Sequence, residues 1–284
     1  MTNDKRKAAV IGWPVKHSRS PLIHGHWLKT HEIAGTYEAI AVAPDDIQSF
    51  FEDFPKSGLV GANVTIPHKE TVIPFLSSLD KAALEIGAVN TVWLEDKDLH
   101  GTNTDWTGFL DNLDQEARGW DSKRNTALVV GAGGAARGIV YGLNQRGFDR
   151  IVVANRTLER AEVLAKGFGH AIEPIGLAQA QAVVGEADVV VNTTSLGMEG
   201  SDLMPIDLAA AQNECVVTDI VYVPLETPFL RDAKRYALKT VDGLGMLLHQ
   251  AAPGCEKWFG VRPIVTAELR AEIVADLNKT DEQI

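Results

Sequence analysis

The sequence predicts an α/β protein made of two parts. Apolar runs of strand length alternate with helical stretches along the whole chain, which is typical of βαβ units. A glycine-rich turn stands between a strand and a helix in the middle of the chain. At 284 residues the chain exceeds an average single domain, so two domains are expected.

The glycine-rich turn follows an apolar run at 127–130 and precedes a helical stretch and a second apolar run at 151–154. This order is the context that the G-x-G-x-x-G/A dinucleotide fingerprint requires. The first glycine permits the tight turn, the second lets backbone N–H groups approach a pyrophosphate, and Ala136 keeps helix and strand close. We therefore predict a doubly wound Rossmann domain, with an unrelated tight turn as the alternative. Its pyrophosphate-binding residues would be Gly131, Ala132, Gly133, Gly134 and Ala135.

The end of the second strand indicates which dinucleotide binds. NAD sites carry an acidic residue there, which accepts a hydrogen bond from the ribose 2′-hydroxyl. This chain has no acid at that position and offers Asn155, Arg156, Thr157 and, one helical turn on, Arg160. Guanidinium groups bind phosphate oxygens in pairs, so these residues favour the 2′-phosphate of NADP(H). Surface arginines without a ligand are the alternative.

Composition and charge argue against several classes of protein. The formal net charge of −11 argues against nucleic-acid binding, which usually needs a basic face. No apolar run approaches the roughly 18 residues of a membrane helix, and the N-terminus lacks the apolar stretch of a signal peptide. Cys215 and Cys255 lack metal-ligand spacing, so we expect two free thiols in a reducing cytoplasm.

The first part of the chain is expected to form its own sheet. Strands are predicted at 8–11, 37–42, 58–66, 88–94 and 100–103, with a turn at 95–98. Helices are predicted at 21–31, 46–54 and 68–76. Ser20 is placed to cap the first helix, with Pro21 in its first turn, and Pro67 opens the third.

The nucleotide-binding part is expected to begin with a helix at 107–116. Strands follow at 127–130, 151–154, 189–192, 216–220 and 239–241, with helices between them, including one at 228–237 capped by Thr227. Two helices close the chain, at 246–258 and 267–277, and the apolar face of the last needs a surface to cover. We expect them to return to the first part. The predicted domains are a substrate-binding domain of residues 1–106, completed by 243–284, and an NADP-binding domain of residues 107–242.

Polar residues gather where predicted strands of the first part end, and again after the last predicted strand. Ligands of open α/β sheets bind beyond the carboxyl ends of the strands, so these segments could converge on one cleft. They supply hydroxyls, amides, lysines and carboxylates, which suits a small polyhydroxylated acid. The segments are 12–21, 63–69, 87–91, 101–108 and 242–250.

Lys69 and Asp105 are the candidate acid–base pair in these segments. Reduction of a carbonyl needs a hydride, which the cofactor brings, and a proton for the developing alkoxide. Lys69 is the best proton donor, and Asp105 could hold its ammonium group. Each has a plainer explanation: Lys69 as a solvated charge, and Asp105, like Ser20, as a helix N-cap. The histidines show no metal-ligand spacing, so no metal is expected.

Seven motifs together resemble the shikimate dehydrogenase family, and they follow one another from Gly12 to Gln250. They are G-x-P-V-x-H-S-x-S-P at 12–21, N-V-T-I-P-H-K at 63–69, G-A-V-N-T at 87–91, N-T-D-x-x-G at 103–108, G-A-G-G-A-A-R at 131–137, N-R-T at 155–157 and G-x-x-M-L-x-x-Q at 243–250.

The resemblance implies a role for each position that matches a family motif. Ser18 and Ser20 would bind the substrate carboxylate, with Tyr222 nearby, and Lys69 and Asp105 would form the catalytic pair. The ring hydroxyls would be hydrogen-bonded by Asn63, Thr65, Asn90 and Gln250. The residues implied around the nicotinamide half of the cofactor are Asn192, Thr193, Thr194, Ile220 and Gly243.

The implied activity is the reversible NADPH-dependent reduction of 3-dehydroshikimate to shikimate in aromatic amino acid biosynthesis. A quinate/shikimate dehydrogenase of the same fold is the close alternative, although quinate users resemble the first motif with Thr at one of the two serines. A non-catalytic NADP-binding regulator is the alternative from another class. The expected partners are small molecules, without nucleic acid or membrane, and the expected oligomeric state is a monomer or homodimer.

Overall fold

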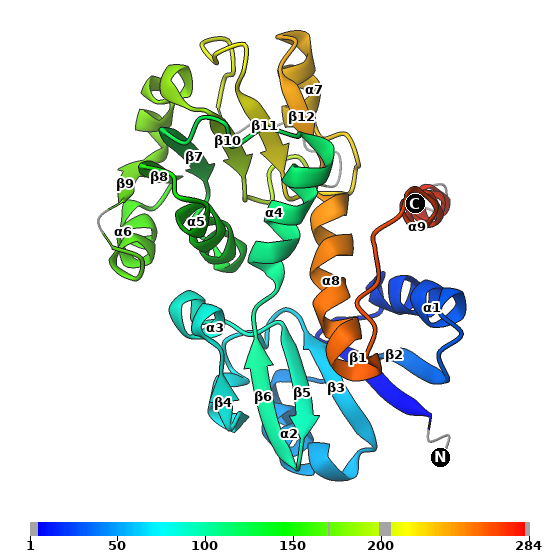
Figure 1. The fold of residues 1–284 in the computed structure, drawn as a ribbon. Helices are drawn as coiled ribbons and strands as arrows, with labels where there is room; N and C mark the ends of the chain where they lie inside the picture. The colour runs from blue at the N-terminus through cyan, green and yellow to red at the C-terminus, as the bar shows by residue number, and fades with distance from the viewer. Residues whose placement is uncertain (1–4, 170, 199–205, 282–284) are drawn as a thin grey trace. The chain divides into compact units, whose positions relative to one another are not determined.

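The computed structural model describes residues 5–169, 171–198 and 206–281. The chain forms two compact units (Figure 1). The first consists of Met1–Thr104 and Leu248–Ile284, and the second of Asp105–Leu247. The chain therefore passes between the units twice, once after Thr104 and once after Leu247.

The described residues of the first unit form a six-stranded mixed sheet in the order β2-β1-β3-β5-β6-β4. Its parallel part places β1 (Arg6–Gly12) between β2 (Gly35–Ala41) and β3 (Leu59–Val64). The antiparallel part adds β5 (Thr91–Glu95) and β6 (Asp98–Thr102), which form a hairpin. The short strand β4 (Ser78–Leu79) pairs with β6 at the edge.

Both faces of this sheet are covered. Successive side chains of a strand point to opposite faces, and Ala9 and Ile11 of β1 pack on one face with Phe51 of α2 (Ile47–Asp53). On the other face, a side chain at Gly61 would collide with the indole of Trp258. That indole donates a hydrogen bond to the carbonyl oxygen of Val92 at 2.9 Å, which ties a C-terminal helix to β5.

The C-terminal helices complete the first unit, as predicted. Trp258 lies on α8 (Leu244–Phe259), and α9 (Ala267–Asp281) packs on α1 (Ser20–Thr30). Ion pairs join α1 to α9, between Arg19 and Asp276 at 2.7 Å and between His26 and Glu272 at 2.7 Å. The apolar face predicted for the last helix is buried through Leu269, Ile273 and Leu277.

The described residues of the second unit form a six-stranded, fully parallel sheet in the order β12-β11-β10-β7-β8-β9. This is a doubly wound sheet, because the chain starts at the central strand β7 and builds outward in both directions. The strands are β7 (Thr126–Val130), β8 (Arg150–Asn155), β9 (Ile172–Gly176), β10 (Val189–Asn192), β11 (Val216–Asp219) and β12 (Lys239–Val241).

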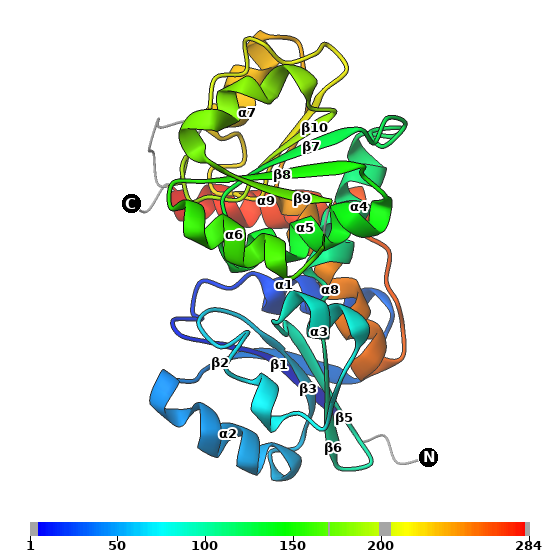
Figure 2. The same ribbon diagram turned by 90° about the vertical axis from the view of Figure 1, so that its left-hand side faces the viewer.

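Helices cover both faces of this second sheet (Figure 2). Ala127 and Val129 face one buried cluster, which includes residues of α4 (Asp105–Glu116), α5 (Gly134–Arg146) and α6 (Leu158–Lys166). Leu128 and Val130 face another, which includes α7 (Pro228–Arg235). Because side chains on both faces of the sheet are buried, these strands are continuous apolar runs in the sequence. The predicted α/β class with a doubly wound domain is therefore confirmed.

Several local predictions need correction. The helix predicted at 68–76 is a series of turns that ends in a short 3-10 helix, Ile73–Phe75. Pro74 has no N–H to continue a helix from the residues before it, but it is tolerated in the first turn of the 3-10 helix. Ser20 is the first residue of α1 rather than its cap; Arg19 takes the cap position and makes no side-chain capping bond. Two strands and one α-helix of the described residues were not predicted: β4, β9 and α3 (Lys81–Ile86).

The predictions for Thr227 and for the two cysteines are confirmed. Thr227 caps α7 by accepting a hydrogen bond from the Leu230 N–H at 3.3 Å. Cys215 and Cys255 are both free and buried, and burial raises the pKa of each thiol to about 12. Among the helices of the described ranges, none is both long and apolar enough to span a membrane.

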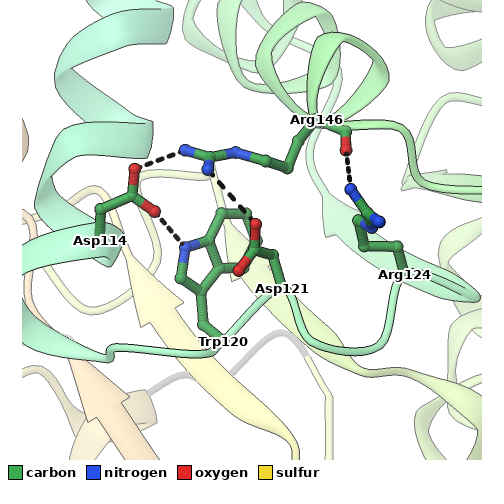
Figure 3. A network of polar contacts seen from close by, with 5 residues as sticks. All are labelled: Asp114, Trp120, Asp121, Arg124 and Arg146. Carbon is green, nitrogen blue, oxygen red and sulfur yellow. Dashed lines mark hydrogen bonds and ion pairs between the residues drawn. The ribbon is translucent and has the colours of Figure 1, made fainter.

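A polar network fastens the end of α4 to the end of α5 within the second unit (Figure 3). The Arg146 guanidinium bonds Asp114 at 2.6 Å and Asp121 at 3.3 Å and lies over the Trp120 ring, 5.4 Å from its centroid. Trp120 in turn donates to Asp114 at 2.8 Å, and Arg124 donates to the Arg146 carbonyl at 3.2 Å. One guanidinium thus fixes α4 and the loop that follows it.

Replacing Arg146 with alanine should destabilise the second unit measurably. Because the network is half-exposed, we expect a loss of about 1–2 kcal/mol in the free energy of unfolding and roughly 3–6 °C in melting temperature. Arg231→Ala is the matched control, because Arg231 forms an exposed 3.8 Å pair with Glu226. Thermal denaturation followed by circular dichroism measures both. Equal melting temperatures for the two variants would contradict a stabilising network.

Candidate functional site

The loop that follows β1 carries the two serines predicted to bind a carboxylate. Ser18 accepts a hydrogen bond from the Ser20 N–H at 3.3 Å, so the side chain of the first serine shapes the turn into α1. Ser18 is half-buried and Ser20 is buried. Gly12 ends β1 against Thr65, where a side chain would collide with the threonine methyl group. The loop after β1 and the end of β3 therefore lie together.

A buried hydrogen-bond network joins three of the predicted substrate-binding residues. Asn63, at the end of β3, donates to the Asn90 carbonyl at 3.1 Å and to Thr91 Oγ1 at 3.1 Å. The Asn90 amide donates to Thr104 Oγ1 at 3.0 Å and to Gln250 Oε1 at 3.2 Å. Thr104 also donates to the Gln250 carbonyl at 2.7 Å. Residues from β3, β5 and α8 thus meet at one end of the first sheet.

The turns after β3 hold Thr65 and Lys69. The Thr65 N–H bonds the Ile11 carbonyl at 2.9 Å, and its own carbonyl accepts from the His68 N–H at 2.9 Å. The Lys69 carbonyl accepts a hydrogen bond from the Val89 N–H at 2.7 Å. The Lys69 backbone is therefore fixed beside the residue that precedes Asn90, and its side chain is half-buried.

Asp105 is the first residue of α4 and of the second unit. It follows Thr104 directly, and the Thr104 N–H bonds the Asn90 side chain at 2.8 Å. An acid in the first turn of a helix is favourable, because it faces the positive end of the helix dipole. The structure places Lys69 and Asp105 in different units, so their predicted contact stays a prediction.

The glycine-rich turn of the second unit has the features that a pyrophosphate requires. Gly131 has φ +113°, and a side chain there would collide with Thr193. Gly133 and Gly134 are exposed at the start of α5, and a side chain at either would meet no atom within 4 Å. The backbone at the positive end of α5 is thus open to an anion. Ala136 is buried between helix and sheet, as predicted.

The end of β8 carries the residues predicted to bind a 2′-phosphate. The Asn155 amide donates to the Thr157 carbonyl at 2.8 Å, which shapes the turn into α6. Thr157 takes the N-cap position of α6, and Arg160 lies in its first turn. Arg156 and Arg160 are exposed, and neither forms an ion pair with a carboxylate in the described part of the chain.

Residues predicted near the nicotinamide meet at the ends of β10, β11 and β12. The Thr193 hydroxyl donates to the Val130 carbonyl at 2.9 Å, beside Gly131. Gly243 lies against Ile220, where a side chain would collide with the Ile220 carbonyl. Tyr222 is half-buried on the segment that follows β11.

Asn192 is held by the protein through both atoms of its amide. Its nitrogen donates to Asp219 at 3.0 Å, and its oxygen accepts from the Thr194 N–H and hydroxyl at 3.0 and 2.7 Å. Burial raises the pKa of the Asp219 carboxyl, although this group also accepts hydrogen bonds from Thr227 and the Val221 N–H. These hydrogen bonds fix the Asn192 side chain and join the ends of β10 and β11.

The structure thus assembles two sets of predicted residues, each in its own unit. The first set surrounds Asn63, Asn90 and Gln250, and the second surrounds the glycine-rich turn. Sequence reasoning missed Tyr37, whose hydroxyl donates to Asn63 Oδ1 at 2.6 Å. The available signal was a tyrosine in a predicted strand, since a buried phenol needs a hydrogen-bond partner. Within the described ranges, no three His, Cys, Asp or Glu side chains come together as metal ligands.

Two family models match the chain. Residues 10–92 match the shikimate dehydrogenase substrate binding domain, and residues 113–224 match the model described as shikimate / quinate 5-dehydrogenase. The two matches fall in the first and second units, respectively.

Known proteins are similar over nearly the full chain. A shikimate dehydrogenase (NADP(+)) of Azorhizobium caulinodans is 56% identical over 272 residues, which is 96% of this chain and 97% of that protein. A shikimate 5-dehydrogenase of Thermus thermophilus, solved with NADP(H) and shikimate, is 34% identical with a TM-score of 0.85 over 96% of this chain and 99% of that one. A quinate dehydrogenase of Corynebacterium glutamicum, solved with NAD, is 28% identical with a TM-score of 0.89 over 96% and 99%. At these levels of identity and coverage, the chain belongs to the shikimate dehydrogenase family.

Proposed function

We propose that the protein is an NADP-dependent shikimate dehydrogenase, which reversibly reduces 3-dehydroshikimate to shikimate in aromatic amino acid biosynthesis. The observation that carries the proposal is the 56% identity, over nearly both full chains, to a shikimate dehydrogenase (NADP(+)). The local geometry supports it, because the first unit gathers neutral hydrogen-bonding groups suited to a polyhydroxylated ring. The second unit offers an open glycine turn and two exposed guanidinium groups suited to a dinucleotide phosphate.

The cofactor residues of the second unit fit NADP(H). Backbone N–H groups from Gly131 to Ala135 would hold the pyrophosphate, where Gly133 and Gly134 leave the approach open. Asn155, Arg156, Thr157 and Arg160 would hold the 2′-phosphate. When bound, the nicotinamide supplies the hydride, near the chain segments that contain Asn192, Thr193, Thr194, Ile220 and Gly243.

The substrate would be oriented by the first unit. Ser18 and Ser20 would donate hydrogen bonds to its carboxylate, with Tyr222 of the second unit near the same group. Asn63, Thr65, Asn90 and Gln250 would line the ring. Because the Asn63, Asn90 and Gln250 side chains are tied to one another or to backbone atoms, they are preorganised and lose little freedom on binding.

Lys69 would supply the proton that carbonyl reduction requires. Its ammonium group donates one proton to the oxygen that becomes the new hydroxyl, and it takes that proton back in the oxidation direction. Asp105 would hold the ammonium and share its hydrogen-bond network. Within the first unit, the Lys69 carbonyl accepts a hydrogen bond from the Val89 N–H, and the next residue, Asn90, accepts one from the N–H of Thr104, the residue before Asp105.

The proposal extends to the cellular setting. Two buried free thiols and the bacterial relatives with the same name support a cytoplasmic enzyme. Its substrate is a small molecule, and a monomer or homodimer would suffice, because both sets of residues belong to one chain.

Initial rates with shikimate and with quinate, each with NADP and with NAD, test the proposed function. We expect the fastest oxidation with shikimate and NADP. Quinate carries an extra hydroxyl on the carbon that bears the carboxylate and needs space there, which Ser18 and Ser20 are not expected to leave. Faster turnover of quinate with NAD would identify a quinate dehydrogenase instead. Tight NADPH binding without turnover of either acid would indicate a regulator.

Lys69→Ala tests the proton donor. We expect kcat to fall by roughly 10² to 10⁴, the usual contribution of general acid–base catalysis, while KM for shikimate changes less. Lys81→Ala is the control, because Lys81 is an exposed lysine that pairs only loosely with Glu85, at 3.7 Å. Steady-state kinetics measures both variants. A kcat close to that of the unmodified enzyme would mean that another group delivers the proton.

Arg156→Ala tests the choice of cofactor. Loss of a charge-assisted hydrogen bond should raise KM for NADP by roughly 10- to 100-fold and leave KM for NAD nearly unchanged. Arg235→Ala, which removes an exposed arginine of α7, is the control and should affect neither constant. Equal losses with the two cofactors would mean that Arg156 does not meet the 2′-phosphate.

A further inference from the structure

Arg19 stands between Ser18 and Ser20, the two serines proposed to bind the substrate carboxylate. Its side chain is mostly buried, with 15% of it exposed, and its Nε lies 2.7 Å from Asp276 Oδ2 on α9. Its Nη1 donates a hydrogen bond to the His17 carbonyl oxygen at 3.1 Å. One guanidinium group therefore joins the loop that follows β1 to the last helix of the first unit.

The backbone of Arg19 links the two serines to the start of α1. The Ser20 N–H donates to Ser18 Oγ at 3.3 Å, across Arg19, so a shift of Arg19 moves both serines. The Arg19 carbonyl accepts from the Leu22 and Ile23 N–H groups at 3.1 Å each. Arg19 thus takes the N-cap position of α1, and its side chain makes no capping bond.

The position of Arg19 is unfavourable for a cation unless a carboxylate lies nearby. The N-terminus of a helix is the positive end of its dipole, and Arg19 adds a positive charge there. The Asp276 carboxylate offsets this cost, because it lies against the guanidinium group. The charge of Arg19 is therefore explained by α9 rather than by α1, the helix that it begins.

α9 is a firm support for this contact. It lies beside α1 (Figure 1), and a second ion pair joins the two helices between His26 and Glu272 at 2.7 Å. The apolar face of α9 is buried through Leu269, Ile273 and Leu277. A side chain that reaches α9 is thus attached to a packed element of the first unit.

We propose that Arg19 and Asp276 form a positioning pair, through which α9 holds Ser18 and Ser20 in place for the substrate carboxylate. Two hydroxyls bind one carboxylate well only when both lie at hydrogen-bond distance at the same time. A loop that is held before binding loses less freedom when the substrate arrives. The pair acts through the two serines and not on the reacting carbon. This inference rests on the proposed function.

Asp276→Asn tests the pair. We expect KM for shikimate to rise roughly three- to tenfold, since the ion pair is only partly buried. Because the proton donor and the cofactor residues are untouched, kcat and KM for NADP should stay within about twofold. Steady-state kinetics measures all three constants. A partial loss of folded protein lowers the apparent kcat but leaves KM unchanged, so KM separates positioning from stability.

Glu272→Gln is the matched control. Glu272 lies on the same helix as Asp276, has a similar exposure (44% against 41%) and also pairs with α1 at 2.7 Å. Its partner is His26, which lies within α1 and not beside the two serines. KM for shikimate should therefore stay within about twofold of its original value in this variant.

A double variant tests whether the two residues act together. Arg19→Gln should raise KM for shikimate by a factor similar to that of Asp276→Asn. The double variant Arg19→Gln, Asp276→Asn should be no worse than the more affected single variant, because both changes break one interaction. Losses that multiply in the double variant would show that the two residues act independently, and would overturn the pair.

The outcomes separate this inference from the proposed function. If the unmodified protein does not oxidise shikimate, the proposed function fails, and the inference fails with it. If shikimate is oxidised but Asp276→Asn leaves KM for shikimate unchanged or lowers it, only the inference is overturned. The same holds if Glu272→Gln raises this KM as much as Asp276→Asn does, because general packing of α9 would then be sufficient.

Discussion

The hydrogen bonds of Asn90 are the constraint on which the first unit's site depends. This single amide binds the residue that precedes the first passage between the units, Thr104, and a residue just after the second, Gln250. Thr104 and Gln250 also bond each other directly. The two chain crossings are therefore tied together, and to β5, by buried polar contacts. Because an unpaired buried amide is costly, these bonds hold Thr104 and Gln250 in one position relative to β5 within the first unit.

The second unit also has an asparagine with a fully hydrogen-bonded side chain at the end of its own sheet. Asn192 is held there by Asp219 and Thr194, much as Asn90 is held by its neighbours. The strand ends of a parallel sheet leave backbone groups that need partners, and an asparagine supplies a donor and an acceptor at once. Fully engaged amides fix the strand ends, whereas the backbone at Gly133 and Gly134 of the glycine-rich turn stays open.

The sequence predicted the second sheet well because its strands are buried on both faces. Strands β7, β8, β10, β11 and β12 were placed within a residue or two, since two-sided burial requires a continuous apolar run. The edge strand β9 was missed because it contains Pro174 and exposes Glu173, and neither signals a strand. The prediction of a helix at 68–76 was wrong because Pro74 cannot continue a helix from the residues before it.

The candidate site was predictable in its composition but not in its hydrogen bonds. Motif and strand-end arguments identified Asn63 and Asn90 alike, because both are asparagines beside predicted strands. Their different hydrogen-bond partners depend on which atoms each amide faces, and only coordinates give that. Tyr37 was overlooked for a similar reason: β1 lies between its strand and that of Asn63, so neither spacing nor periodicity links the two.

The electrostatics of α6 give an independent reason to expect an anion at the end of β8. Cations are unfavourable at a helix N-terminus, where the backbone dipole is positive, yet Arg156 and Arg160 flank the Thr157 cap. Neither is neutralised by an ion pair within the described residues, in a chain with an excess of eleven negative charges overall. Stability alone would favour carboxylates at these positions. A bound phosphate would reverse the balance, because it is attracted by both guanidinium groups and by the helix dipole at once.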